Sequence, residues 1–367
     1  MNSNNFTQRS IFIKNPKKIN QEINRIIEFV VESFEKSKLY VNLYISGSLA
    51  RQEPTVKIIN KEEKLNSDLD FVLIHKENTE KQKEIFDIVE KIKKQYKDYD
   101  CSFVVLCQDQ LPKVNSLFAR DLKLGMKNPI YKSFEEQQKI RVEITEKNYF
   151  ESLITQMCCY LLNPDFTMSK NENKYFKSSD YHYMKLTMEC IRAIHYNAPN
   201  VLGYNTLFGL RCKTLNEKEN NSCIKARELS NRTYMPDIDI NILLDEAFTV
   251  LFQRKNYIHL VVNELVASET SDIILFQYAM LLFWKGLSED RYLHDTFYTF
   301  KKVEFVEPFI DEINDNFTSY LSDKSTFAKE KVILCIREIR NLYVELLHQQ
   351  NTGELLFVDK ILKNNIE

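Results

Sequence analysis

The sequence has little glycine, almost no net charge and no long apolar run. Six glycines in 367 residues predict helices with few tight turns. With 50 basic and 52 acidic residues the net charge is −2, so no broad electrostatic field draws the chain to nucleic acid or membrane. No apolar run approaches ~18 residues, and no basic-then-apolar leader opens the sequence. We therefore expect a cytoplasmic protein without membrane contact, and a nucleic-acid partner is disfavoured.

The cysteines and histidines do not suggest a metal site. None of the eight cysteines forms a C-x-x-C pair, so zinc is not expected and the thiols are best interpreted as reduced core residues. The six histidines do not cluster, and His182 and His195 are too far apart on one expected helix to share a metal. We assign the histidines no chemical role.

The segment from residue 44 to residue 74 carries the chemically informative residues. One apolar run breaks at Gly47-Ser48, and a second opens at Asp68-Leu69-Asp70. Residues two apart on a β-strand point the same way, so the two aspartates would lie side by side. Such carboxylates repel unless a cation lies between them, and hard oxygen ligands favour Mg²⁺. Glycine and serine offer close backbone approach and donors for phosphate. Together these residues predict a metal-bound nucleoside triphosphate at a sheet edge.

The order Gly-Ser, spacer, Asp-x-Asp resembles the signature of the DNA polymerase β-like nucleotidyltransferase superfamily. It is nearest in pattern to the aminoglycoside adenylyltransferases of the streptomycin and spectinomycin type, where an acid precedes an apolar strand similar to residues 101–106. The resemblance covers roughly residues 20–135. It implies transfer of a nucleoside monophosphate, expected to be AMP, from ATP or another triphosphate to a hydroxyl, with two Mg²⁺ ions held by strand carboxylates and with release of pyrophosphate.

The resemblance also implies roles for individual residues. The catalytic metal ligands would be Asp68, Asp70 and Asp100. The nucleotide-binding residues would be Gly47, Ser48, Arg51, Ser67 and Lys185. The third ligand stays open by register, because Asp98, Asp100 and Ser102 share one strand face and some relatives have the acid at the position of Ser102; we favour Asp100.

Each of these assignments has a plainer alternative. Asp-x-Asp alone is common where a turn enters a strand, and its weight here comes from the preceding Gly-Ser. Arg51 could be a solvated arginine, and Lys185 could be a surface lysine instead of a triphosphate ligand from a second domain. The spacer between Ser48 and Asp68 is longer than the family usually shows and carries the charged insertion Lys61–Lys64.

Hydrophobic periodicity predicts an α+β protein with a small mixed-sheet domain followed by a mainly helical domain. Apolar positions at 19, 23, 26, 27, 30, 31 and 34 predict an amphipathic helix, and residues 41–45, 69–74 and 100–107 predict strands. Beyond residue 146 helical periodicity dominates, with polar connectors such as residues 216–222. We place a nucleotidyltransferase catalytic domain at 1–146 and a helical domain at 147–367, with a possible sub-boundary near 255.

The acceptor is expected at the junction of the two domains, the usual place for a small-molecule cleft. Asp180 and Tyr183, with Tyr181 and Glu189 nearby, are the candidate acceptor-binding residues. One hypothesis is a small hydroxylated molecule such as an aminoglycoside, and another is a second nucleotide in messenger synthesis. A third is an inactive nucleotidyltransferase fold that serves as a binding or regulatory module. The sequence does not indicate an oligomeric state.

Overall fold

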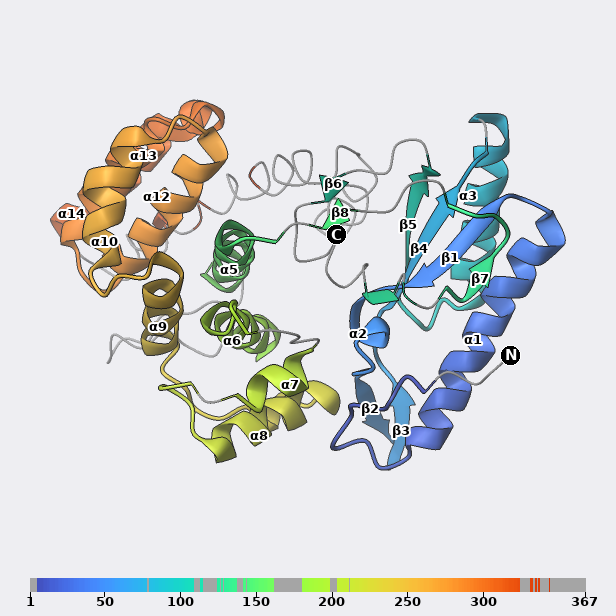
Figure 1. Ribbon diagram of the computed structural model, residues 1–367. Helices are drawn as coiled ribbons and strands as arrows, with labels where there is room; N and C mark the ends of the chain where they lie inside the picture. The colour runs from blue at the N-terminus through green and yellow to red at the C-terminus, as the bar shows by residue number, and fades with distance from the viewer. Residues whose placement is uncertain are drawn as a thin grey trace.

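The computed structural model has a small mixed β-sheet with covering helices, followed by a mainly helical region, so the expected α+β class is confirmed (Figure 1). The structure describes residues 5–77, 79–108, 113–114, 124–125, 127, 129–136, 141–142, 144–161, 180–198, 203–210, 212–323 and the positions 331, 332, 334, 336 and 343.

Helix α1 (Pro16–Ser37) follows directly from the apolar pattern. A proline opens it, where the missing N–H costs nothing, and Lys38 ends it in the left-handed conformation at φ 58°. Its buried side chains are those at the seven predicted positions, which confirms the amphipathic helix. Each such burial stabilises the fold by roughly 1.5–3 kcal/mol, so this stripe fixes α1 against the sheet.

The main sheet has the strand order β5-β4-β1-β7, with β1 (Val41–Ile45), β4 (Leu69–His75), β5 (Cys101–Cys107) and β7 (Tyr131–Lys132). Strand β4 runs antiparallel to β1 and parallel to β5, so the sheet is mixed. The short strands β6 (Lys113–Val114) and β8 (Arg141–Val142) pair separately. The parallel pairing of β4 and β5 brings the two acidic strand entrances to one edge of the sheet.

The long spacer after Gly-Ser is a β-hairpin formed by β2 (Val56–Ile59) and β3 (Glu62–Leu65). Asn60 and Lys61 form its turn with positive φ values of 52° and 67°, as a two-residue hairpin turn requires. The carboxylate of Glu63 accepts hydrogen bonds from the backbone N–H groups of Lys14 and Asn15 at the start of α1. The charged insertion thus has a structural role.

Most of the remaining helices lie beyond residue 146, where the sequence predicts helical periodicity. Their bounds are α2 (Gly47–Ala50), α3 (Thr79–Gln95), α5 (Glu146–Leu161), α6 (Asp180–Ile194), α7 (Tyr204–Phe208), α8 (Glu217–Glu228), η2 (Arg232–Tyr234), α9 (Ile240–Phe252), α10 (Tyr257–Leu260), η3 (Val261–Leu265), α11 (Val266–Ser268), α12 (Asp272–Gly286), α13 (Arg291–Phe300), η4 (Glu304–Phe309) and α14 (Ile310–Asp323). Within the described part of the chain, no helix combines the length and apolarity that crossing a bilayer would need.

Helix α8 corrects one sequence interpretation. The polar stretch 216–222 is not a connector, because it forms the N-cap and opening turns of this helix. Asn216 accepts a hydrogen bond from the N–H of Glu219, whose side chain accepts one from the N–H of Asn216. This reciprocal capping box satisfies two otherwise orphaned donors and starts a helix in a strongly polar segment.

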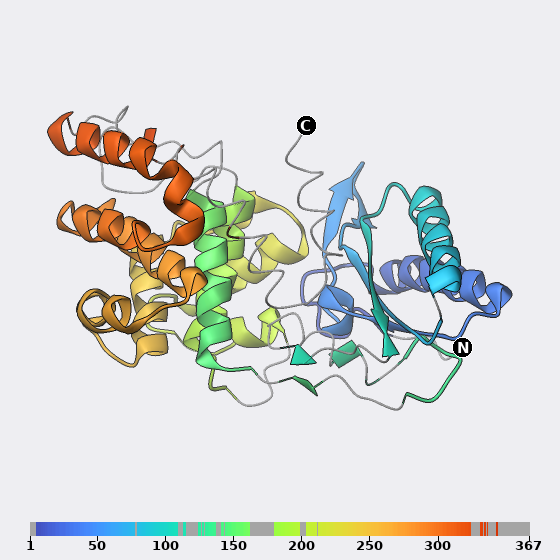
Figure 2. The same cartoon turned by 90° about the horizontal axis from the view of Figure 1, so that it is seen from above.

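Two hydrophobic clusters occupy the two parts of the molecule. One combines buried residues 6–105 with Leu229, and the other spans residues 149–343. The expected boundary at 146 falls between them, whereas the possible sub-boundary near 255 falls inside the second. Figures 1 and 2 show α1 and α3 on one side of the sheet and the helical region on the other.

A buried carboxylate joins the two parts. Glu53, on the loop after α2, is fully buried and accepts hydrogen bonds from the N–H groups of Tyr204 and Asn205 at the start of α7, each 3.0 Å long. The Nη2 atom of Arg227 in α8 lies 3.7 Å from the Glu53 carboxylate and donates to its backbone carbonyl at 2.6 Å. A Cβ atom at Gly203 would lie 2.2 Å from Oε1 of Glu53, so only glycine permits this approach.

We predict that Glu53→Gln lowers the free energy of unfolding by about 3 kcal/mol or more, because it removes the nearest opposite charge from the buried Arg227 guanidinium. Urea denaturation measures the change. The matched control is Glu264→Gln, which removes an exposed ion pair with Arg254 and should leave the midpoint unchanged. Equal stability of the two variants would contradict the structural role of Glu53.

Candidate functional site

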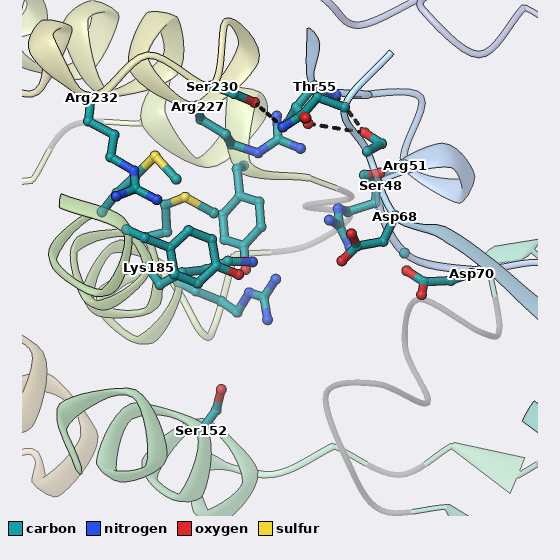
Figure 3. A pocket seen from close by; sticks show the side chains of 18 residues that line it. Ser48, Arg51, Thr55, Asp68, Asp70, Ser152, Lys185, Arg227, Ser230 and Arg232 are labelled. Atoms are coloured by element: carbon teal, nitrogen blue, oxygen red, sulfur yellow. Dashed lines mark hydrogen bonds between the residues drawn. The ribbon is translucent and has the colours of Figure 1, made fainter. Parts of the chain in front are cut away.

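A polar cavity of about 520 Å³ lies between the sheet edge and the helical region (Figure 3). Seven of the ten residues predicted from the sequence line it: Gly47, Ser48, Arg51, Ser67, Asp68, Asp70 and Lys185. Residues of helix α2, next to the sheet, and of helix α6, in the helical region, therefore line the same cavity. Asn66 donates a 3.1 Å hydrogen bond to Ser230, which links the two walls at one rim.

Gly47 and Asp70 form the tightest part of the sheet-side wall. Gly47 has φ +60°, and a Cβ atom there would lie 2.2 Å from Oδ2 of Asp70. The glycine is needed both for its left-handed conformation and for the close approach of the carboxylate. The neighbouring N–H of Ser46 donates to the backbone carbonyl of Asp70 at 2.8 Å, which holds β4 against the turn.

The candidate third ligand lies at the margin of the site. Asp70 is paired in register with Ser102, whose hydroxyl donates to Oδ1 of Asp70 at 2.6 Å. Asp100 is exposed just before β5, and its carbonyl accepts the N–H of Leu69 at 2.8 Å. It does not line the cavity, but it acts with Asp68 on Tyr181: burial raises the pKa of this phenol, and the charges of both carboxylates add to the rise.

Three arginines surround the ring of Tyr204 in the cavity wall. The guanidinium carbons of Arg51, Arg192 and Arg227 lie 5.2, 4.5 and 5.4 Å from the ring centroid. Cations over an aromatic face are attracted to its quadrupole, which offsets part of their mutual repulsion. Nη1 of Arg227 is buried and has no hydrogen-bond partner among the described residues. This orphaned donor is what an anion-binding wall would contain.

Two acidic side chains support the arginines from behind. Glu53 lies 3.9 Å from Nε of Arg51 in addition to its contact with Arg227. Glu189 accepts the Tyr204 hydroxyl at 2.6 Å and lies 3.3 Å from Nη1 of Arg192. The expected acceptor role of Glu189 is therefore replaced by one in the wall, because its carboxylate is buried in these contacts.

Lys185 and Arg232 contact a different ring of the cavity wall, that of Tyr181. The Lys185 ammonium and the Arg232 guanidinium carbon are each 5.5 Å from the ring centroid. Burial lowers the pKa of Lys185, an effect that the charge of Glu189 opposes and that of Arg51 increases. Neither basic group has an ion pair with the residues that the structure describes. The surface-lysine alternative for Lys185 does not apply, since this side chain lines the cavity.

Of the two residues assigned to acceptor binding, Tyr183 lies away from the cavity and the Asp180 side chain is not described. Tyr183 is buried in the helical core, where its hydroxyl donates to the carbonyl of Ile238 at 3.0 Å and accepts the N–H of the same residue at 2.9 Å. Asp180 begins α6, and its side chain lies outside the described part of the structure. Tyr181, named beside them, does line the cavity.

Several cavity residues were missed from the sequence. Met184, Met188 and Arg192 follow Tyr181 and Lys185 on one face of α6, and the 3.6-residue period could have revealed them once Lys185 was chosen. Arg227, Ser230 and Arg232 come from a different segment, and no local signal connects them to the aspartates. Their placement depends on the packing of α8 and on its contact with Glu53.

The carboxylates that line the cavity could supply only some of the oxygen ligands that a hard cation needs. Among the residues that the structure describes, no group of three or more His, Cys, Asp or Glu side chains is arranged to hold a metal ion. Two carboxylates two residues apart do line the cavity, however. Mg²⁺ is commonly held by one or two carboxylates together with substrate phosphates and water, so this pair fits a metal that arrives with a phosphate ligand.

Comparison with known proteins does not indicate a function, so a function can be inferred only from the site. No family model matches the sequence, and no curated protein or solved structure is significantly similar to it.

We predict that Gly47→Ala destabilises the protein by about 2 kcal/mol, because alanine is strained at positive φ and its Cβ would displace Asp70. Thermal and urea unfolding measure the change. The control is Gly209→Ala, since Gly209 has φ −72° and a Cβ atom there would lie no closer than 3.2 Å to its nearest neighbour, the carbonyl oxygen of Thr206. Equal tolerance of both alanines would contradict the close contact between Gly47 and Asp70.

Proposed function

We propose that the protein is a Mg²⁺-dependent nucleotidyltransferase that transfers a nucleoside monophosphate, AMP in the first instance, from a triphosphate to a hydroxyl of a small molecule. The observation that carries the proposal is the cavity itself: two carboxylates at the start of β4, Asp68 and Asp70, lie across it from four basic side chains of the helical region, with Arg51 beside them. In a metal-bound triphosphate the Mg²⁺ ion is attracted to the carboxylates and the phosphates are attracted to the basic side chains. A cytoplasmic location, expected from the sequence, is part of the proposal.

The basic wall would bind the phosphates. Arg227 is held by a 2.6 Å hydrogen bond to the backbone carbonyl of Glu53, and the Glu53 carboxylate lies 3.9 Å from Nε of Arg51. Planar guanidinium groups form paired hydrogen bonds to phosphate oxygens. Lys185 adds a half-buried ammonium whose pKa is lowered by burial, and a nearby phosphate would restore the charged form.

The sheet edge would hold the cation. Asp68 and Asp70 supply the oxygen ligands, with Asp100 as the candidate third carboxylate, and bound Mg²⁺ would neutralise charge on the phosphates. The hydrogen bond from Ser102 orients the Asp70 carboxylate. Gly47 leaves room for that carboxylate against the turn.

The proposed reaction exchanges one phosphorus–oxygen bond for another. The acceptor oxygen bonds to the α-phosphorus, and the bond from this phosphorus to the oxygen bridging to the β-phosphorus breaks. Pyrophosphate leaves, and the hydroxyl proton passes to a base. Asp100 is the candidate base because its charge, like that of Asp68, reaches Tyr181 at the cavity rim.

A nucleotide-binding module without transfer activity is the second candidate. The residue beside Asp70 on β5 is Ser102 and not an acid, which favours this alternative. Incubation with each labelled triphosphate and Mg²⁺, alone and with candidate acceptors, separates the two. Triphosphate binding without pyrophosphate release from any mixture would support the module.

We predict that Asp68→Ala and Asp70→Ala each lower pyrophosphate release by roughly 10²–10³-fold or more, because each removes a contact that stabilises transition-state charge. Initial rates with saturating triphosphate measure the loss, and circular dichroism checks the fold. The control Asp98→Asn changes an exposed acid and should keep normal activity. If either alanine variant kept more than about a tenth of the wild-type rate, the assignment would be wrong.

The third carboxylate is tested separately. We predict that Asp100→Asn is nearly inactive, whereas Ser102→Ala loses only a few-fold activity because it removes one hydrogen bond to Asp70. Rates at several Mg²⁺ concentrations distinguish a lost metal ligand, which raises the Mg²⁺ requirement, from a lost base. The reverse ranking of the two variants would assign the central position to Ser102.

A further inference from the structure

The charges that line the cavity differ between its two walls in a way that bears on the acceptor. Five lining residues are basic (Arg51, Lys185, Arg192, Arg227 and Arg232), and two are acidic (Asp68 and Asp70). Both acids belong to the sheet edge. Among the described residues, the helical wall therefore presents cations and no carboxylate to the cavity.

The basic residues are not equally compensated. Arg51 and Arg227 share Glu53, and Arg192 is paired with Glu189. Lys185 and Arg232 have ring contacts with Tyr181 but no ion pair among the described residues. Burial lowers the pKa of Lys185, and the charge of Asp68 opposes part of this shift. Arg232 and Lys185 are therefore the two basic lining groups without an ion pair among the described residues.

Arg232 lies on the side of the cavity away from the proposed metal edge. Figure 3 shows it across the pocket from Asp70. The ring of Tyr181, which contacts both Lys185 and Arg232, belongs to a residue that is 41% exposed and is therefore accessible to a ligand. An anion held by Arg232 would be separate from a triphosphate held at Gly47, Ser48 and Arg51.

We propose that the acceptor carries a phosphate group in addition to its reacting hydroxyl, and that Arg232 binds this phosphate beside Tyr181. This inference rests on the proposed function, because it assigns the two aspartates to metal. With those aspartates engaged, no described carboxylate lining the cavity remains for the ammonium groups of an aminoglycoside, which would meet uncompensated cations. The aminoglycoside acceptor suggested by the sequence is therefore disfavoured.

The test uses binding in two stages, measured by isothermal titration calorimetry. The full-length protein is first saturated with Mg²⁺ and the non-hydrolysable analogue α,β-methylene ATP. The filled protein is then titrated with AMP, glucose 6-phosphate, glucose and kanamycin. AMP and glucose 6-phosphate distinguish a nucleotide from a sugar phosphate as the source of the phosphate group, and glucose and kanamycin provide neutral and cationic comparisons.

We expect the filled protein to bind at least one phosphorylated probe and to bind glucose and kanamycin more weakly. Arg232→Ala should weaken the phosphorylated probe by roughly tenfold or more, the loss expected for a hydrogen bond to a charged group, and leave analogue affinity within about threefold. Arg254→Ala, an exposed arginine outside the cavity, is the matched control and should change neither affinity. Arg232→Lys should recover part of the loss.

The outcomes separate this inference from the proposed function. If the analogue does not bind the wild-type protein, the proposed function fails and this inference fails with it. If the analogue binds but neither phosphorylated probe does, or kanamycin binds more tightly than both, the inference alone is overturned. It is also overturned if Arg232→Ala weakens the analogue and not the probe, since Arg232 would then be a triphosphate ligand.

Discussion

The buried carboxylate of Glu53 is the contact on which the geometry of the cavity depends. It extends from the sheet-side unit into the helical region, where it accepts two N–H groups of α7 and partners Arg227 of α8. A buried ion pair is stable only when further hydrogen bonds satisfy the charges, and the Glu53 carboxylate has two such bonds, from the N–H groups of Tyr204 and Asn205. Because Arg51 also lies beside it, one acid positions basic groups on both walls. The arginine cluster is thus part of the fold as well as of the site.

Local patterns were sufficient to predict part of the sheet-side unit, but not the β2–β3 hairpin or the short strand β7. The stripe on α1, the strands β1 and β4 and the turn at Gly47 each leave a signal within a few residues, because burial against one neighbour fixes the periodicity. The same reasoning located Asp68 and Asp70 at a cavity. Lys185 came from the resemblance instead, and it lines the cavity because residues 181, 185, 188 and 192 follow one face of α6. Residue 183 turns about 200° away from 181 at about 100° per residue, which explains why Tyr183 lies in the core.

The remaining site residues could not be found in this way. Arg227 reaches the cavity through its contact with Glu53, 174 residues earlier in the chain, and Tyr204 through its contact with Glu189. The sequence around Arg227 and Tyr204 contains no pattern that predicts these long-range contacts. The capping box at Asn216 was visible in the sequence, but a polar helix without an apolar stripe gives no periodic signal. Its prediction would have placed α8 without showing which of its side chains face the aspartates.

The basic wall has an energetic consequence for the protein without ligand. Arg51, Arg192 and Arg227 repel one another around Tyr204, and burial of Arg227 lowers its pKa, which reflects the cost of keeping this charge from water. The charge of Glu53 raises the pKa of Arg227 and offsets that cost only partly, because the like charge of Arg51 lowers it further. An anion bound between these arginines would reduce their repulsion in the folded protein. The unfolded chain has no such cluster of arginines, so the anion would bind the folded state preferentially. If the proposed triphosphate binds at these arginines, its binding therefore also stabilises the fold.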